Sequence, residues 1–243
     1  RIKGHAYFDS NHIPMAIMWK NGIKNPGRVE DDYFSTIDIA PTILELAGVS
    51  GEKEGMAPIT GHSMVDVMKN KKKADIDRGF VMIGKERHDV GRPNDWGYPI
   101  RGIIRGGYLY LRNFEPERWP AGNPETGYSN VDASPSKTET IQARRKSETE
   151  YLWKLSFGKR LAEELYNIMD DSYCIYNLAD KQEYNSIKEK LRKEMFSKLV
   201  EQGDPRVFGF GEIFDIYSNV SPRNNYYTRW KNGEKINPVG AVL

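Results

Sequence analysis

Residues 84–89, GKERHD, place lysine, glutamate, arginine and histidine side by side at the end of an apolar segment that predicts a strand. Loops at strand ends commonly deliver ligand-binding side chains. Arg87 can hold a carboxylate or sulfate through two parallel hydrogen bonds. His88 can hydrogen-bond a hydroxyl group or donate a proton to a leaving group. The stretch predicts an anion-binding site, with a solvated turn as the alternative.

Arginines and aromatic residues also gather around a second segment. Arg101 and Arg112 fall on a predicted hairpin, and Trp96, Tyr98 and Trp119 flank or follow it. Aromatic faces stack on sugar rings, and arginines bind anionic substituents. The combination predicts a cleft for an anionic sugar, and structural packing is the alternative for each side chain.

The composition excludes several classes of function. A formal net charge of +2 over 243 residues gives no global field for nucleic acid. No run reaches the roughly 18 apolar residues that a membrane span needs. Cys174 is the single cysteine, which rules out an intrachain disulfide, and the four histidines are scattered. We therefore expect no nucleic-acid partner, no membrane span and no His/Cys metal site within these residues.

The first third of the chain has the pattern of an α/β domain. The apolar run 13–19 lacks alternation, which favours a strand buried on both faces. Residues 33–37 predict another strand, and Asp38 begins a helix over 39–47 that ends before a glycine. A short helix is predicted over 64–70.

The remainder has the pattern of an α+β layer. Strands are predicted at 79–84 and 174–178, and a hairpin at 98–105 and 108–113 turns at Gly106-Gly107. A helix that opens at Ser186 carries an apolar stripe and ends before a glycine. Its stripe consists of Ile187, Leu191, Met195 and Leu199. A Pro-, Gly- and Ser-rich stretch at about 115–146 predicts a long loop.

Several of these segments, in order along the chain, resemble the sulfatases. KGHAY at 3–7, followed by Pro14 and an apolar run to Trp19, is similar to the family's K-x-x-x-Y signature and the strand after it. The stretch 21–49 resembles a turn leading to a D-[IL]-x-P-T helix, and GHSMVDVM at 61–68 resembles G-x-S-L-x-P-L-L. ELYNIMDD at 164–171 and CIYNLADKQEYNSI at 174–187 resemble partial copies of E-L-Y-D-L-x-x-D-P-x-E-x-x-N-L-A.

The resemblance implies an α/β fold in two parts. Residues 1–74 would be the end of an alkaline-phosphatase-like α/β sheet domain. Residues 75–243 would be a smaller C-terminal α+β domain, with an antiparallel sheet packed against a long helix. The passages 84–89 and 98–125 narrow the resemblance to sulfatases of glucosamine-containing glycans, including N-sulfoglucosamine sulfohydrolase-like members.

The resemblance also assigns roles to individual residues. Lys3 matches the lysine that contacts the sulfate, where an ammonium group stabilises the negative charge that develops during hydrolysis. His5 follows two residues later and is a candidate substrate contact, together with Arg87, His88 and Arg101. The nucleophile, formylglycine made from Cys or Ser, and the calcium ligands would lie upstream of this chain. Cys174 lacks the Pro and Arg that accompany that nucleophile.

The function expected from this resemblance is hydrolysis of a sulfuric ester or sulfamate on a sulfated sugar or glycosaminoglycan. The chain would be a C-terminal fragment, inactive by itself, whose partner is the N-terminal part of the same protein. Family members are exported, so a periplasmic or extracellular location is expected. Two alternatives stay open: another alkaline-phosphatase-superfamily hydrolase, such as a phosphodiesterase or phosphonate hydrolase, and a noncatalytic glycan-binding module.

Overall fold

A computed structural model describes residues 4–49, 57–87, 90–126, 131, 134–220 and 224–236. The chain divides into two compact units. The sheet unit comprises Arg1–Ile13 and Met82–Leu243, and the helical unit comprises Pro14–Val81. The chain passes from one unit to the other within strand β1 (Phe80–Lys85). The boundary predicted after residue 74 stays a prediction.

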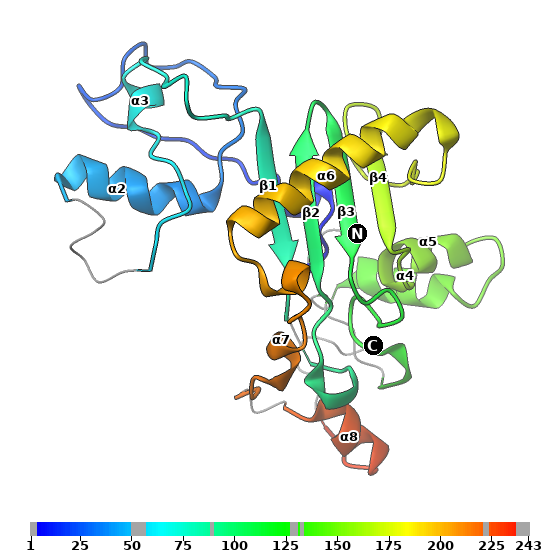
Figure 1. Ribbon diagram of the computed structural model, residues 1–243. Helices are drawn as coiled ribbons and strands as arrows, with labels where there is room; N and C mark the ends of the chain where they lie inside the picture. Colours follow the sequence, from blue (N-terminus) through cyan, green and yellow to red (C-terminus); the bar gives the residue numbers. More distant parts are fainter. Residues whose placement is uncertain are drawn as a thin grey trace. The chain divides into compact units, whose positions relative to one another are not determined.

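The core of the sheet unit is a four-stranded sheet in the order β1-β2-β3-β4 (Figure 1). Strand β2 (Ile100–Arg105) pairs antiparallel with β3 (Tyr108–Asn113), which pairs antiparallel with β4 (Glu163–Asn167). Gly106 and Gly107 make the β2–β3 turn at φ +58° and +79°, a region that glycine enters without steric penalty. The predicted hairpin and the predicted strand before it are confirmed.

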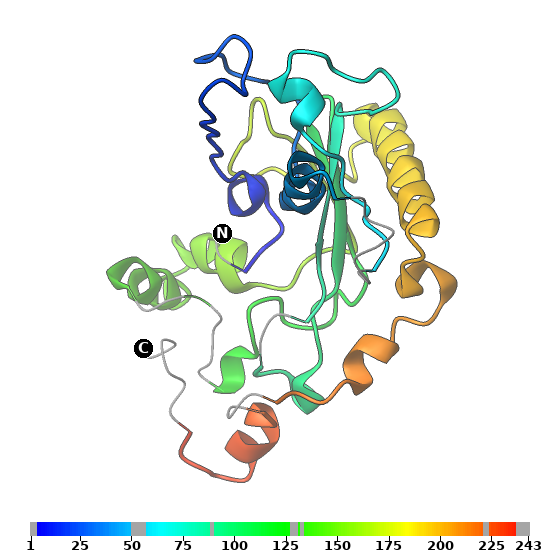
Figure 2. The same ribbon diagram turned by 90° about the vertical axis from the view of Figure 1, so that its left-hand side faces the viewer.

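Helix α6 (Asn185–Glu201) covers one face of this sheet. Leu191, Met195 and Leu199 recur at four-residue spacing and are 0–3% exposed, whereas Ile187 is half-buried. Helices α1 (Phe8–Asn11), α4 (Pro135–Ala143) and α5 (Glu150–Phe157) lie on the opposite face (Figure 2). The predicted antiparallel sheet with a long packed helix is therefore confirmed.

Short elements complete the sheet unit. They are η3 (Pro93–Asp95), η4 (Pro124–Thr126), η5 (Gln182–Tyr184), η6 (Pro205–Phe208), α7 (Ile213–Ile216) and α8 (Tyr226–Lys231). The segment predicted as a long loop contains η4 and α4, and α4 begins where the Ser134 hydroxyl accepts a hydrogen bond from the amide of Lys137 at 3.1 Å.

The strand predicted at 174–178 is wrong. Asp171 explains why, because its carboxylate accepts hydrogen bonds from the amides of Ile175 and Tyr176, at 3.0 and 2.8 Å. Those amides are therefore unavailable to a neighbouring strand. The fourth strand is instead β4, which contains the first of the two E-L-Y-like copies.

The helical unit contains η1 (Thr36–Asp38), α2 (Ile39–Ala47) and α3 (Val65–Met68). The Asp38 carboxylate accepts hydrogen bonds from the amides of Ser35 and His62, both at 2.8 Å. The Thr42 hydroxyl donates to the Asp38 carbonyl at 2.6 Å and accepts from the amide of Met64 at 2.9 Å. Two motifs that sequence similarity picked out separately are therefore joined by hydrogen bonds.

The strands predicted at 13–19 and 33–37 are wrong, since neither segment forms a strand in the described structure. The run 13–19 has no regular secondary structure and leaves apolar side chains in solvent: Met15, Met18 and Trp19 are 50%, 97% and 41% exposed. A strand requires a hydrogen-bonded neighbour, and among the described residues no strand pairs with this run. The helix predicted over 39–47 is confirmed, and that over 64–70 is shorter than predicted.

Candidate functional site

Two of the five predicted site residues, Lys3 and His88, lie outside the residues that the structure describes. Their roles stay predictions. The other three, His5, Arg87 and Arg101, all belong to the sheet unit.

His5 belongs to a short segment, Gly4–Tyr7, that is fixed at several points. Gly4 has φ +79°, and its carbonyl accepts a hydrogen bond from the ammonium group of Lys85 at the end of β1. The His5 side chain is buried, and its ring centroid lies 5.7 Å from that of Tyr7. The segment therefore holds His5 in one place, while a substrate contact by this ring stays a prediction.

Tyr7 connects this segment to strand β4 of the sheet. Its hydroxyl donates to Oε2 of Glu164 at 2.9 Å, although the two residues are 157 positions apart. The same oxygen accepts from the Tyr166 hydroxyl at 2.5 Å, and Oε1 accepts from Nδ2 of Asn113 at 2.7 Å. All four side chains are almost fully buried, so the K-x-x-x-Y and E-L-Y motifs meet in one polar cluster inside the sheet unit.

A very small cavity of about 10 Å³ adjoins this cluster. His5, Tyr98, Asn113 and Glu164 are among the residues that line it. The Tyr98 hydroxyl and Oδ1 of Asn113 are buried and have no hydrogen-bond partner within the described structure. Burial, and then the negative charge of Glu164, raise the pKa of the Tyr98 hydroxyl, which keeps it protonated.

Arg101 lies in an ion-pair network rather than in an open cleft. Its guanidinium contacts Asp204 at 2.5 Å and Glu86 at 2.9 Å, and Glu86 also pairs with Arg206. Burial by itself would lower the pKa of Arg101, but the hydrogen bonds and charges of Asp204 and Glu86 outweigh it and raise the pKa. The network joins β1 and β2 to the turn after α6, and substrate binding by Arg101 stays a prediction.

Arg87 also contacts the protein's own backbone. Its Nε donates to the carbonyl of Asp95 at 2.9 Å, and a terminal nitrogen donates to the carbonyl of Tyr217. A neighbouring ion pair, between Arg118 and Asp215 at 2.8 Å, ties the same loops together. Arg87 and Arg101 thus both contact groups of the protein itself, and both stabilise the loops at one end of the sheet.

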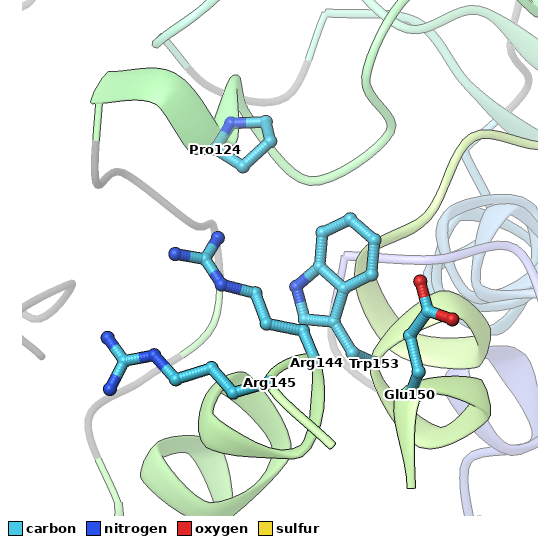
Figure 3. Close-up of a pocket in the computed structure, with 5 residues that line it drawn as sticks. All are labelled: Pro124, Arg144, Arg145, Glu150 and Trp153. Carbon is cyan, nitrogen blue, oxygen red and sulfur yellow. The ribbon is translucent and has the colours of Figure 1, made fainter. Parts of the chain in front are cut away.

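An open pocket of about 590 Å³ lies where α4 meets α5, and the sequence had not indicated it (Figure 3). Arg144 reaches into the space between Pro124 and the indole of Trp153, while Arg145 extends from the same turn. Glu150 lies on the other side of the indole, where it pairs with Lys154 at 2.8 Å. The sequence shows two adjacent arginines and a nearby tryptophan, but no local pattern predicts that they line the same pocket.

No group of three or more His, Cys, Asp or Glu side chains in the described ranges is arranged to hold a metal ion. Cys174 is buried. Calcium, with ligands expected upstream, therefore stays a prediction. No helix within the described part of the chain combines the length and apolarity needed to cross a bilayer.

Comparison with known proteins identifies similarity to sulfatases and to a sulphohydrolase family. Residues 3–82 match the family described as N-sulphoglucosamine sulphohydrolase, C-terminal. Two curated proteins of Formosa agariphila, each named ulvan-active sulfatase, are 28% identical over 79% of the chain and 25% identical over 91%. The chain spans 34% of the length of each.

Solved structures are less similar in sequence to this chain. A 2-O GAG sulfatase is 16% identical, with a TM-score of 0.48, and the match covers 89% of this chain and 34% of that one. A protein solved in complex with its substrate D-glucosamine-2-N,6-O-disulfate is 17% identical, with a TM-score of 0.42, over 72% of this chain and 26% of that one.

Proposed function

We propose that the whole protein hydrolyses a sulfuric ester or sulfamate on a sulfated sugar or glycosaminoglycan, because the chain is similar to sulfatases. The observation that carries this proposal is the sequence similarity to an ulvan-active sulfatase along 79% of the chain. The fold supports it as well, because Tyr7 of the K-x-x-x-Y segment and Glu164 of the E-L-Y segment are hydrogen-bonded to each other.

Within this proposal, Lys3 places its ammonium group beside the sulfate oxygens and stabilises the charge that grows on them. A formylglycine and a calcium ion, both upstream, would supply the nucleophile and further charge neutralisation. His5, Arg87, His88 and Arg101 would orient the sugar. Export to the periplasm or the cell exterior is part of the same proposal.

The proposal includes a partner, the polypeptide that precedes Arg1 in the whole protein. Ile39, Ile43 and Leu46 of α2 are 40%, 59% and 44% exposed, and the run 13–19 is exposed as well. Large exposed apolar patches usually mark an interaction surface. The preceding polypeptide would cover these exposed apolar side chains with further strands of the α/β sheet.

The test is expression of the chain together with the coding sequence upstream of it. Inorganic sulfate release would be measured from ulvan oligosaccharides, N-sulfoglucosamine and an aryl sulfate. We expect release by the longer protein and none by residues 1–243 alone. Lys3→Ala should lower kcat by about 10²- to 10³-fold, as removal of one charge-stabilising donor does elsewhere. Faster cleavage of a phosphodiester or phosphonate would overturn the sulfatase assignment.

The pocket of Figure 3 favours a second function, glycan binding by the chain itself. An indole face suits a sugar ring, and guanidinium groups suit its sulfate. Calorimetric titration of residues 1–243 with a sulfated disaccharide tests this. Binding without any catalysis in the longer protein would favour the noncatalytic module over the hydrolase.

A further inference from the structure

Two neighbouring glutamates on β4 can be compared directly, because they differ in burial and in the face of the sheet that they occupy. Glu163 and Glu164 are consecutive in a strand, so their side chains point to opposite faces of the sheet. Each accepts a hydrogen bond from a tyrosine hydroxyl, Glu163 from Tyr110 at 2.5 Å and Glu164 from Tyr7 at 2.9 Å. Glu163 is partly exposed, whereas Glu164 is 4% exposed.

The buried position of Glu164 makes its hydrogen bonds demanding. A carboxylate removed from water loses its hydration, and it is tolerated only where donors replace that hydration. Tyr7, Tyr166 and Asn113 supply three such donors. Of these, Tyr7 alone lies outside β3 and β4, so its bond attaches a distant segment to the sheet.

The attached segment is the one that carries the proposed chemistry. Tyr7 lies two residues after His5 and four residues after Lys3 in the sequence. On its other side, the carbonyl of Tyr7 accepts from the amide of Ser10 at 3.0 Å and from Nδ2 of Asn11 at 2.8 Å, which joins it to α1. A shift of the Tyr7 ring would therefore move both His5 and the start of α1.

The small cavity beside the cluster gives a second observation. Its volume of about 10 Å³ is close to the least that holds one water molecule. Two buried polar atoms without a protein partner, the Tyr98 hydroxyl and Oδ1 of Asn113, belong to residues in its lining. Such a site favours one ordered water, because each unmet buried polar group is costly.

We propose that Glu164 is a positioning residue, which holds Tyr7 and thereby fixes the Gly4–Tyr7 segment, with one bound water completing the cluster. Glu164 does not touch substrate. It acts by keeping His5, and the chain that leads to Lys3, in register with the rest of the sulfatase site. The kinetic part of this inference rests on the proposed function, whereas the structural part does not.

Hydrogen exchange on residues 1–243 tests the structural part. Glu164→Ala and Tyr7→Phe should each speed amide exchange in a peptide covering residues 5–12 by about 10-fold or more, with β2 and β3 still protected. Glu163→Ala is the matched control and should leave residues 5–12 unchanged. Equal exchange in that peptide for the Glu163 and Glu164 variants overturns the proposal. Tyr7→Phe removes a single hydroxyl, so it serves even where Glu164→Ala does not fold.

Kinetics of the longer protein test the positioning part. Glu164→Gln should lower kcat by about 10- to 100-fold with KM nearly constant, since small displacements of catalytic groups have effects of that size. Glu163→Gln should change neither constant by more than about 2-fold. Unaltered kcat in Glu164→Gln, despite faster exchange at residues 5–12, overturns the positioning role. If the longer protein without substitutions has no sulfatase activity, the proposed function is overturned instead. Hydrogen exchange at residues 5–12 then still tests whether Glu164 holds Tyr7.

Discussion

Arg78 and Asp66 form a two-point ion pair in the helical unit, with nitrogen–oxygen distances of 3.1 and 2.8 Å, and both side chains are more than nine-tenths buried. Asp66 also accepts from the amide of Lys73 at 2.9 Å. The second terminal nitrogen of Arg78 donates to the carbonyl of Ser63 at 3.0 Å. The pair thus joins α3 to the chain segments on both of its sides.

Asp66→Asn should destabilise the helical unit by about 3–5 kcal/mol, because Arg78 is then left buried without a counter-charge. Urea unfolding at pH 7, followed by exchange in peptides from residues 57–78, measures this. Lys71→Ala, an exposed change nearby, is the control and should stay within about 0.5 kcal/mol. A loss below about 1 kcal/mol would mean that the pair is solvated.

Acid should weaken the same unit. Burial by itself raises the pKa of Asp66, but hydrogen bonds from the amides of Lys73 and Val67, and from Arg78, outweigh burial and lower the pKa. A lowered folded-state pKa means that the stabilisation is complete above the unfolded value of about 3.9 and is lost as pH falls through the folded value. Urea midpoints of wild type and Asp66→Asn should therefore converge below pH 4. A constant difference down to pH 2 contradicts this.

Arg101 offers a way to separate structure from substrate binding. Arg101→Lys keeps the positive charge but loses the fork that contacts Asp204 and Glu86. We expect a loss of about 1–3 kcal/mol in thermal or urea unfolding. Its cross-strand partner Arg112 provides the control variant, Arg112→Lys. Should Arg101→Lys unfold like wild type while KM rises in the longer protein, Arg101 would be a substrate contact after all.

Tyr98→Phe reports on the buried water. The Tyr98 hydroxyl is fully buried and lacks a protein partner in the described structure. Where a water occupies the adjoining cavity, the substitution strands that water and should destabilise by about 1 kcal/mol. Without the water, loss of an unpaired hydroxyl should be neutral or stabilising. Urea unfolding of the variant against wild type distinguishes the two signs.

Sequence reasoning succeeded where the cause of a structure lies within a few residues of it. The Gly106-Gly107 pair specifies its own turn, and the spacing of Leu191, Met195 and Leu199 specifies the buried face of α6. Because the residues that determine these elements lie within the elements themselves, the hairpin and the long helix could be predicted.

It failed where a structure depends on contacts that a residue pattern does not show. The run 13–19 has the pattern of a strand, but no strand pairs with it in the described part of the chain. In the segment 174–178, the amides of Ile175 and Tyr176 donate instead to the Asp171 carboxylate. Glu164 was recognised as part of an E-L-Y motif, yet nothing local shows that its hydrogen-bond partner is Tyr7, 157 residues away. The pocket residues Arg144 and Trp153 meet only because α4 and α5 pack together.

The pocket between α4 and α5 should bind anionic sugars mainly through charge. Arg144→Ala and Trp153→Ala are each expected to weaken a sulfated disaccharide by about 5- to 30-fold, through loss of the ionic contact and the stacking contact. Binding should weaken as ionic strength rises, because exposed charges are screened. Arg229→Ala, at a partly exposed arginine on α8 that pairs with Glu234, is the control in calorimetry. Affinity unaffected by both pocket substitutions would place the sugar elsewhere.

Substitutions of exposed apolar side chains in the helical unit should have a cost in stability that depends on the length of the protein. Met18 is 97% exposed and Ile43 is 59% exposed in residues 1–243. Met18→Ser and Ile43→Ser should therefore change the stability of this chain by no more than about 0.5 kcal/mol, and should raise its solubility. In the longer protein, where we propose that further strands cover these side chains, each should cost about 1.5–3 kcal/mol. Lys20→Ser, an exposed polar change nearby, should be neutral in both proteins. Unfolding curves of the two lengths decide, and equal costs in both would show that no segment covers this surface.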